Sequence, residues 1–503
     1  MKRITRYIFL LMCWLSPIVC PAQKHDNTWI MGYYYTPNTF VCGLDFYYGS
    51  PDTVGFNPPF SFIGSGAVNM SDDNGTLQFY TNGEYMGNYN NQFLANSTNF
   101  NYDPGSVGDY WQGMFSVPYP GQPNKYFLAH MNGVSYTYNG SPAFGPKKLY
   151  YSVVDMNANN GLGNLSVKKQ IVYTDTILPC VIQGTRHANG RDWWIVNHKA
   201  YSNKFIVSLL TPNGIVQNTT IATGPSLTFF SISEGQSEFS PDGSQFAIAY
   251  NTFNSVYLFD FDRCTGTIAF RDSIHIIPND ASEWPVWGCS FSPNSRFLYA
   301  NTNNDLYQID TWANPIDSGM KLVAVYDGFV DFVSTYFFRQ RLGPDGKIYM
   351  IPWGGSYYLH VINDPDQADT LCNVGQHQLQ LSNYVASVIP DFPNYRLTNL
   401  PGSACDTLTD IISLEDPQEN IKLYPNPNTG NFMVSYALPP NTEGILMAND
   451  LLGRPVYRRT LSAFTTSASV TLEGLASGVY ELVIQGDAFR NSSRFIVSSQ
   501  LKQ

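Results

Sequence analysis

One short segment of the chain concentrates side chains that perform acid–base or metal chemistry. His187, Arg191, Asp192 and His198 lie within twelve residues of one another. Imidazole and carboxylate groups are the usual partners in proton transfer and in metal binding. However, Asn189-Gly190 predicts a tight turn between two strands, and alternate strand residues point to opposite faces. We therefore expect these side chains not to converge, and we predict no metal ligand and no cofactor.

Acidic side chains supply two further candidates. Asp364, Asp366 and Asp369 resemble a Ca²⁺-binding loop, but the glycine and the closing glutamate of an EF-hand are absent, which favours a solvated loop. Carboxylates that cleave glycosidic bonds come in pairs. In a protein built from repeated sheets, such a pair comes from different repeats and leaves no local motif. The candidates of this kind are Glu234, Glu238 and Glu283.

The sequence contains no nucleophile elbow, no His-Glu-x-x-His motif, no Walker loop and no dinucleotide-binding fingerprint. Hydrolase, metalloprotease and nucleotide-dependent functions each lack their usual motif. We predict no catalytic residue from the sequence.

The elements that position these residues follow from an internal repeat. Three segments each read as a strand, a turn and a second strand, and their turns lie 51 to 52 residues apart, at Gly243, Ser295 and Gly346. Weaker copies surround Gly190, Asn124 and Gly75. A period near fifty with a central hairpin is typical of the blades of a β-propeller, as in WD-like repeats.

We therefore predict an all-β protein whose main body, residues 23–405, is a propeller of about seven blades, with six or eight as alternatives. A single sheet of this length cannot bury both faces, so the blades must pack together and the ring must close. We expect the strand at residues 29–35 to close it against residues 388–396.

Residues just before each inner strand of a propeller point toward the central channel. Tryptophan rings bind sugars or protein side chains, and acids and amides orient hydroxyl groups. This reasoning predicts a ligand-binding rim made of Trp111, His187, Glu234, Gln236, Glu283, Trp284, Trp287 and Arg339, together with Gln112 and Gln340. Packing between blades is the alternative role for the tryptophans.

The N-terminus and the composition indicate the compartment. Lys2, Arg3 and Arg6 precede an apolar stretch at residues 8–19, which is too short for a membrane span, so we predict a signal peptide at residues 1–22. No other stretch has the length of a transmembrane helix. The net charge is −11 with no Lys/Arg cluster, which argues against nucleic-acid binding. Aromatic residues make up 15% of the chain, which favours strands over helices.

The last eighty residues form a separate pattern. Residues 421–432 read IKLYPNPNTGNF, and LLGR and LASGVY follow at residues 451–454 and 475–480. The series resembles the type A C-terminal sorting domain of proteins exported by the type IX secretion system. Its motif residues here are Pro425, Asn426, Pro427, Gly430, Gly453, Arg454, Gly478 and Tyr480. The resemblance implies an immunoglobulin-like sandwich at residues 421–503, the type IX machinery as partner, and export to the surface or medium with loss of this domain.

The body also resembles a known family. Residues 43–46, 74–83, 187–195, 261–266 and 390–397 are similar to segments of large secreted propeller proteins that carry the same sorting tail. This resemblance implies fold and location, but no agreed activity.

Cysteines and the linker complete the predicted organisation. Six cysteines remain after the signal peptide, and in an oxidising compartment they permit up to three disulfides. Cys264 and Cys289 are the candidate pair, as a staple between adjacent blades. Residues 406–420 are acidic and lack strand alternation, so we predict a mobile linker.

Two functions stay open at this point. The first is a cell-surface or secreted binding propeller for adhesion or for capture of a glycan or protein. The second is a hydrolase or lyase that acts on polysaccharide or peptide at the mouth of the channel.

Overall fold

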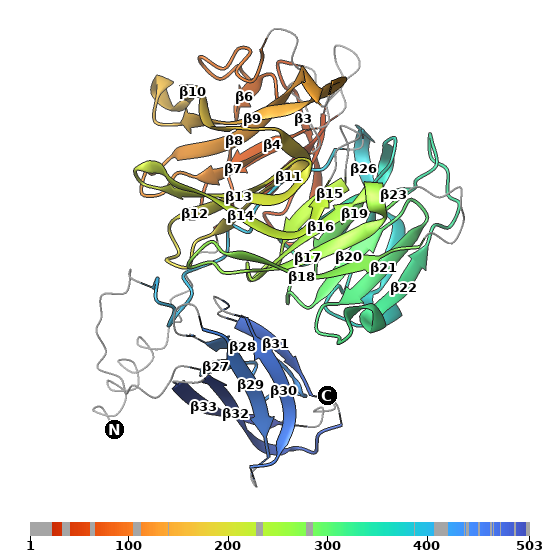
Figure 1. Ribbon diagram of the computed structural model, residues 1–503. Helices are drawn as coiled ribbons and strands as arrows, with labels where there is room; N and C mark the ends of the chain where they lie inside the picture. The colour runs from red at the N-terminus through yellow and green to blue at the C-terminus, as the bar shows by residue number, and fades with distance from the viewer. Residues whose placement is uncertain are drawn as a thin grey trace, which may run out of the picture.

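The computed structural model describes residues 23–32, 41–60, 66–103, 112–138, 140–227, 235–277, 285–386, 388–406, 421–436, 438, 442–450, 453–462, 465, 467–472, 474–486 and 489–498. Strands dominate these residues (Figure 1). The helical segments among them are four short 3-10 turns: η1 (Asn159–Gly161), η2 (Asn251–Phe253), η3 (Ile316–Gly319) and η4 (Asp369–Cys372). In this part of the chain no helix is both long and apolar enough to cross a membrane. The predicted signal peptide lies outside the described residues.

The described body contains seven consecutive antiparallel sheets. The first three sheets are β1 (Thr28–Met31), β2 (Val41–Asp45) and β3 (Asp52–Phe56); β4 (Val68–Ser71), β5 (Leu77–Thr81) and β6 (Met86–Asn88); and β7 (Met114–Pro118), β8 (Lys125–Tyr138), β9 (Ser141–Asp155) and β10 (Asn164–Thr174). The fourth and fifth are β11 (Ile177–Arg186), β12 (Trp193–Lys199), β13 (Ser202–Thr211) and β14 (Gly214–Leu227); and β15 (Gly235–Phe239), β16 (Gln245–Tyr250), β17 (Ser255–Phe261) and β18 (Ile268–His275). The last two are β19 (Gly288–Phe291), β20 (Phe297–Asn301), β21 (Asp305–Asp310) and β22 (Met320–Val325); and β23 (Phe337–Leu342), β24 (Ile348–Pro352), β25 (Ser356–Ile362) and β26 (Val374–Val385).

The predicted hairpins lie between the first two strands of the later sheets. In sheet five, Phe239 of β15 pairs with Phe246 of β16, and Gly243 in the turn between them has a φ of 73°. This left-handed conformation favours glycine because a Cβ atom would be strained there. The repeat that the sequence shows is thus a repeat of hairpins, each set by its own turn residues.

The sheets follow one another around a ring (Figure 1). The first strands of neighbouring sheets lie in contact, from β4 through β7, β11, β15 and β19 to β23. The outer strand β26 of the last sheet contacts β2 and β3 of the first. Sheets packed face to face in this way bury both of their surfaces, as a propeller requires.

The two ends of the body meet where the ring closes. After β26, Ala386 donates a hydrogen bond to the carbonyl of Gly32 (3.1 Å), and Val388 packs in one apolar cluster with Ile30 and Val41. The expected pairing of residues 29–35 with residues 388–396 is wrong for the described residues: β1 pairs with β2, and residues 388–396 form no strand. Residues 33–40 lie outside the described residues.

The C-terminal residues form a separate β-sandwich. One sheet contains β27 (Ile421–Tyr424), β28 (Asn431–Tyr436) and β31 (Ser467–Thr471), and the other contains β30 (Pro455–Leu461), β29 (Gly444–Asn449), β32 (Gly478–Gly486) and β33 (Phe489–Val497). Both sheets contribute to one apolar core, with Phe432 and Phe495 at 4.6 Å between ring centroids. Residues 407–420 of the predicted linker lie outside the described residues.

Candidate functional site

The inner strands fill the central channel with side chains that bond to one another. Gln112 donates to the carbonyl of Ser237 (2.6 Å) and accepts from its backbone nitrogen (2.8 Å) and from Arg339 (3.1 Å). Gln236 of β15 exchanges hydrogen bonds with the backbone of Gln340 in β23, two sheets further along the ring. Gln236 and Arg339, predicted as rim residues, therefore lie inside the channel and join strands across it.

A charged cluster lies at the C-terminal ends of these strands. Arg341 of β23 donates to Glu238 of β15 (2.6 Å) and to Asp391, and all three side chains are largely buried. Burial raises the pKa of Glu238 to about 7, against the attraction of Arg341 and with the repulsion of Asp391. Burial opposes the charge of Arg341, but the two carboxylates outweigh this effect and raise its pKa. The cluster ties sheets five and seven to the segment that follows β26.

That segment, residues 388–406, is called the covering segment below. Its hydrogen bonds reach several sheets: Tyr395 Oη to the carbonyl of Ser116 (2.7 Å), Asn394 Nδ2 to the carbonyl of Pro241 (2.6 Å), Arg396 to both carboxylate oxygens of Asp26 (2.6 and 2.8 Å), Arg263 to the carbonyl of Thr398, and the backbone of Leu400 to that of Ala188 (2.8 Å). The Tyr395 side chain is buried. The covering segment therefore lies across one end of the channel.

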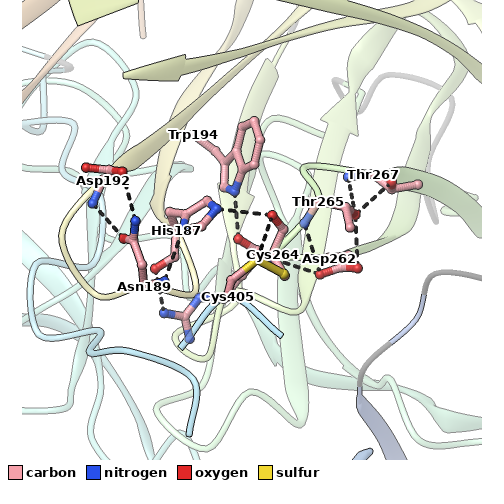
Figure 2. Close-up of a disulfide and its surroundings, with 10 residues drawn as sticks. His187, Asn189, Asp192, Trp194, Asp262, Cys264, Thr265, Thr267 and Cys405 are labelled. Atoms are coloured by element: carbon pink, nitrogen blue, oxygen red, sulfur yellow. Dashed lines mark hydrogen bonds between the residues drawn. A yellow bond between two sulfur atoms is a disulfide. The ribbon is translucent and has the colours of Figure 1, made fainter. Parts of the chain in front are cut away.

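A disulfide fixes the far end of the covering segment. Cys405 is joined to Cys264 in the turn between β17 and β18, with 5.5 Å between the Cα atoms (Figure 2). The carbonyl of Cys264 accepts a hydrogen bond from His187 Nε2 (3.1 Å), and the carbonyl of Arg263 accepts one from Trp194 Nε1 (2.7 Å). These contacts hold the disulfide against sheet four.

The predicted Cys264–Cys289 bridge is therefore wrong. Cys289 begins the inner strand β19, where its buried thiol donates to the carbonyl of Gln236 (3.4 Å). Between the two cysteines runs β18, whose eight residues span about 25 Å. Bonded cysteines need Cα atoms within about 7 Å, so proximity in sequence misled the prediction.

His187 also lies elsewhere than expected. It follows β11 instead of preceding an inner strand, so it belongs to the turn beneath the channel, near the covering segment. Its Nδ1 accepts from the backbone of Asn189 (3.0 Å), which leaves Nε2 to donate to Cys264. Burial lowers the pKa of His187 and keeps the ring neutral. The other three residues of this segment do not converge on His187. Asp192 pairs with Arg191 (2.7 Å), and His198 is buried within β12.

Of the other predicted rim residues, the structure describes Trp287 alone. Trp111, Glu234, Glu283 and Trp284 fall outside the described residues. Trp287, just before β19, packs its ring at 5.4 Å from Phe338 and 5.5 Å from Trp353. These contacts join sheet six to sheet seven. Trp287 is half-buried, so part of the residue remains at the surface.

An exposed aromatic surface adjoins this tryptophan cluster. It comprises the exposed Val330, Phe332, Val333 and Tyr357 and the half-buried Trp353 and Tyr384, and is called the sheet-seven aromatic surface below. Phe332 is 80% exposed and Tyr357 is 41% exposed. Tyr384 lies 6.2 Å from Phe332 and 5.7 Å from Tyr357 between ring centroids.

The sequence reasoning missed this surface because it searched only positions directly before the inner strands. The available signal was the run Gly328-Phe-Val-Asp-Phe-Val333, which is apolar but lacks the alternation of a strand.

The loop that carries Phe332 is held in place from several sides. Asp331 accepts hydrogen bonds from the hydroxyl of Ser356 (2.9 Å) and from the backbone of Tyr357 (2.7 Å). The carbonyl of Phe329 accepts from both the backbone and the hydroxyl of Thr335 (3.2 and 3.0 Å). A loop backbone held in this way has little further freedom to lose.

The described residues contain no group of three or more His, Cys, Asp or Glu side chains that could hold a metal ion.

Comparison with known family models identifies the C-terminal sandwich. Residues 422–498 match the family model of the secretion system C-terminal sorting domain. The protein is therefore a type IX secretion cargo with a β-propeller body, and it is exported to the cell surface or the extracellular space. A comparison with curated proteins finds no match.

Solved structures similar to this chain include two lactonases and one β-propeller domain. A putative 6-phosphogluconolactonase from Bacteroides fragilis is 10% identical with a TM-score of 0.43, over 72% of this chain and 98% of that one. The periplasmic gluconolactonase of Pseudomonas aeruginosa is 12% identical with a TM-score of 0.33, over 73% and 97%. The Swd1 β-propeller domain of Myceliophteria thermophila is 9% identical with a TM-score of 0.34, over 63% and 88%. Similarity this remote carries nothing about activity.

Proposed function

We propose that this exported propeller is a binding protein that captures an extracellular glycan or protein through the sheet-seven aromatic surface. The observation that carries the proposal is the exposure of Phe332 and Tyr357 on a loop pinned by Asp331. Flat aromatic rings stack on sugar rings and on apolar side chains, and they dominate the energetics of many interfaces. The surface lies at one end of the channel, so a ligand bound there does not contact the covering segment at the other end.

Two features make this surface suited to binding rather than to packing within the protein. Val330 is 59% exposed beside Phe332, so the apolar area extends beyond one side chain. Within the surface, the half-buried Trp353 packs against the neighbouring half-buried Trp287, with 5.5 Å between ring centroids. Large apolar groups gathered on a fixed surface mark interaction sites more often than scattered ones do.

The test is a glycan and protein array probed with the secreted protein. Phe332→Ser and Tyr357→Ala should each weaken binding about tenfold or more, and they should leave the melting temperature unchanged because both side chains are exposed. Tyr48→Ala is the matched control, since Tyr48 is 86% exposed in the turn after β2. Equal binding by wild type, Phe332→Ser and Tyr48→Ala would refute the proposal. A hydrolase screen with the same protein tests the alternative, and turnover of a polysaccharide or peptide would favour it.

A further inference from the structure

The sheet-seven aromatic surface belongs to a part of the chain that contains no Lys and no Arg. Residues 322–338 and 348–385 supply this surface and most of the strands that support it, and they contain five Asp and no Glu. Sheets three and four differ, because residues 114–227 contain nine Lys and Arg against three Asp. The electrostatic potential at the aromatic surface is therefore negative, so the surface repels an anionic ligand and attracts a cationic one.

One of these acids lies beside Phe332 in the same loop and has a free oxygen. Asp331 accepts its hydrogen bonds from Ser356 and from the backbone of Tyr357 on the same atom, Oδ2. Its Oδ1 bonds to no residue that the structure describes. Asp331 is half-buried, so this carboxylate both fixes the loop and remains available to a cation at the surface.

Asp327, near the start of the same loop, is a second acceptor. Its side chain is 39% exposed and lies 2.9 Å from His377 Nε2. Burial raises the pKa of this carboxylate, but the hydrogen bond from the backbone of Phe329 and the contact with His377 outweigh burial, so the pKa lies below its ordinary value. Asp327 is therefore charged at neutral pH and adds to the negative potential.

The polar groups of the surface offer little to a sugar. Tyr384 Oη donates to the carbonyl of Gly354 (2.5 Å), and the buried hydroxyl of Ser356 donates to Asp331. The surface contains no Asn, Gln, Lys or Arg, and the hydroxyl that bonds to no described residue is that of Tyr357. A sugar site orients its ligand through several convergent polar groups, and the described residues do not supply them here.

The surface does offer apolar area and aromatic faces. Phe332 is 80% exposed, Val330 is 59% exposed, and Val325 of β22, the strand that leads into this loop, is 53% exposed. Apolar side chains of this size are buried at the centre of protein interfaces, where aromatic residues and Arg are enriched. Arg and Lys also bind over the faces of aromatic rings, which Phe332 and Tyr357 present.

A second copy of this chain fits the surface poorly. In a symmetric dimer the same patch meets itself. Such a contact would bring Asp327 and Asp331 of both copies together, and residues 322–338 and 348–385 supply no Lys or Arg to compensate them. The occupant must therefore bring its own cations.

We propose that the sheet-seven aromatic surface binds a protein segment in which apolar side chains lie beside Arg or Lys. This inference rests on the proposed function and decides between its two ligands, in favour of a protein over a glycan. The apolar side chains of the partner pack on Phe332, Val330 and Tyr357. Its cations approach Asp331 Oδ1 and the faces of the rings.

The experiment compares synthetic peptides that share one apolar pattern and differ only at the intervening positions, which are all Arg, all Gln or all Glu. Fluorescence polarisation measures their binding to the full-length secreted protein. We expect the Arg series to bind about tenfold more tightly than the Glu series, with the Gln series between them, and we expect added salt to narrow this difference. Phe332→Ser should weaken the Arg and Gln series alike, because they share the apolar pattern.

The charge itself is tested by substitution. Asp331→Asn should reduce the tenfold preference for Arg over Glu to about threefold, and its amide oxygen can still accept from Ser356 and Tyr357. An unchanged melting temperature shows that the loop is intact. Asp317→Asn is the matched control, since Asp317 is an exposed acid of η3, outside the two ranges that supply the surface.

Three outcomes would overturn the inference: no peptide series binds, the Arg and Glu series bind equally, or Asp331→Asn changes the preference no more than Asp317→Asn does. An uncharged oligosaccharide that binds the wild type and not Phe332→Ser would overturn it as well, while it would uphold the proposed function. If Phe332→Ser binds every peptide and oligosaccharide as the wild type does, the proposed function fails and this inference fails with it.

Discussion

Removal of the Cys264–Cys405 disulfide should destabilise the propeller through its unfolded state. The two cysteines are 141 residues apart. On the chain-entropy model, a cross-link that closes a loop of this length contributes about 5 kcal/mol, and measured losses for native disulfides are about 2–5 kcal/mol. We expect Cys264→Ala/Cys405→Ala to lose about 4 kcal/mol within that range. The covering segment keeps its hydrogen bonds in this variant, so the native fold should persist.

Urea unfolding followed by tryptophan fluorescence measures this loss for the body alone. All nine tryptophans precede residue 405, so the C-terminal sandwich is silent. The midpoint should fall, and the dependence on urea should steepen because the unfolded chain without the cross-link exposes more surface. Wild type in reducing agent should match the double variant. Cys42→Ala is the control, since Cys42 is a buried free thiol that closes no loop. Equal midpoints for reduced and oxidised wild type would refute the reasoning.

Three further predictions concern charge, export and the linker. Because the pKa of Glu238 is raised from 4.5 to about 7, its contribution to stability is present below pH 4.5 and is lost as the pH rises to 7. Glu238→Gln should remove this loss of about 3 kcal/mol between pH 4.5 and 7.5. The measured quantity is the unfolding free energy of wild type minus that of the variant, because the lowered pKa values of buried His130, His198 and His360 make stability rise with pH in both proteins. Parallel pH profiles of the two proteins would contradict the prediction. Deletion of residues 421–503 should leave the protein in the periplasm by cell fractionation, and export of the truncated protein would show that this domain is only structural. Limited proteolysis should cut first within residues 407–420 by mass spectrometry, whereas a first cut within residues 190–350 would argue against a closed ring.

The sequence predicts the hairpins because their cause is local. Gly243 and Gly346 adopt φ values of 73° and 81°, and such turns are set by the residue that occupies them. The export domain is predictable for the same reason. Its Pro-Asn-Pro run and its glycines are local sequence features, and they lie within the residues that the family model matches.

The position of His187 and the disulfide could not be predicted in this way. The inner strand β11 carries a register shift between Ile177 and Ile182, and Cys180 there has a φ of 65°. Apolar and polar residues do not alternate along this irregular strand. The sequence therefore did not reveal a strand directly before His187. Cys405, the partner of Cys264, lies 141 residues later in the chain. The two cysteines meet only when the whole body closes into a ring.

The contacts of the covering segment predict that the body tolerates loss of the export domain. Its hydrogen bonds and ion pairs with the sheets run from Asp391 to Leu400, and its covalent anchor is Cys405. The predicted linker begins immediately afterwards. A cut anywhere within residues 407–420 therefore removes none of the contacts that close the ring, because the disulfide holds the new C-terminus against the turn that contains Cys264. The propeller that reaches the surface should thus have the same unfolding midpoint before and after processing, whereas a cut between Leu400 and Cys405 would leave residues 401–405 attached only through the disulfide.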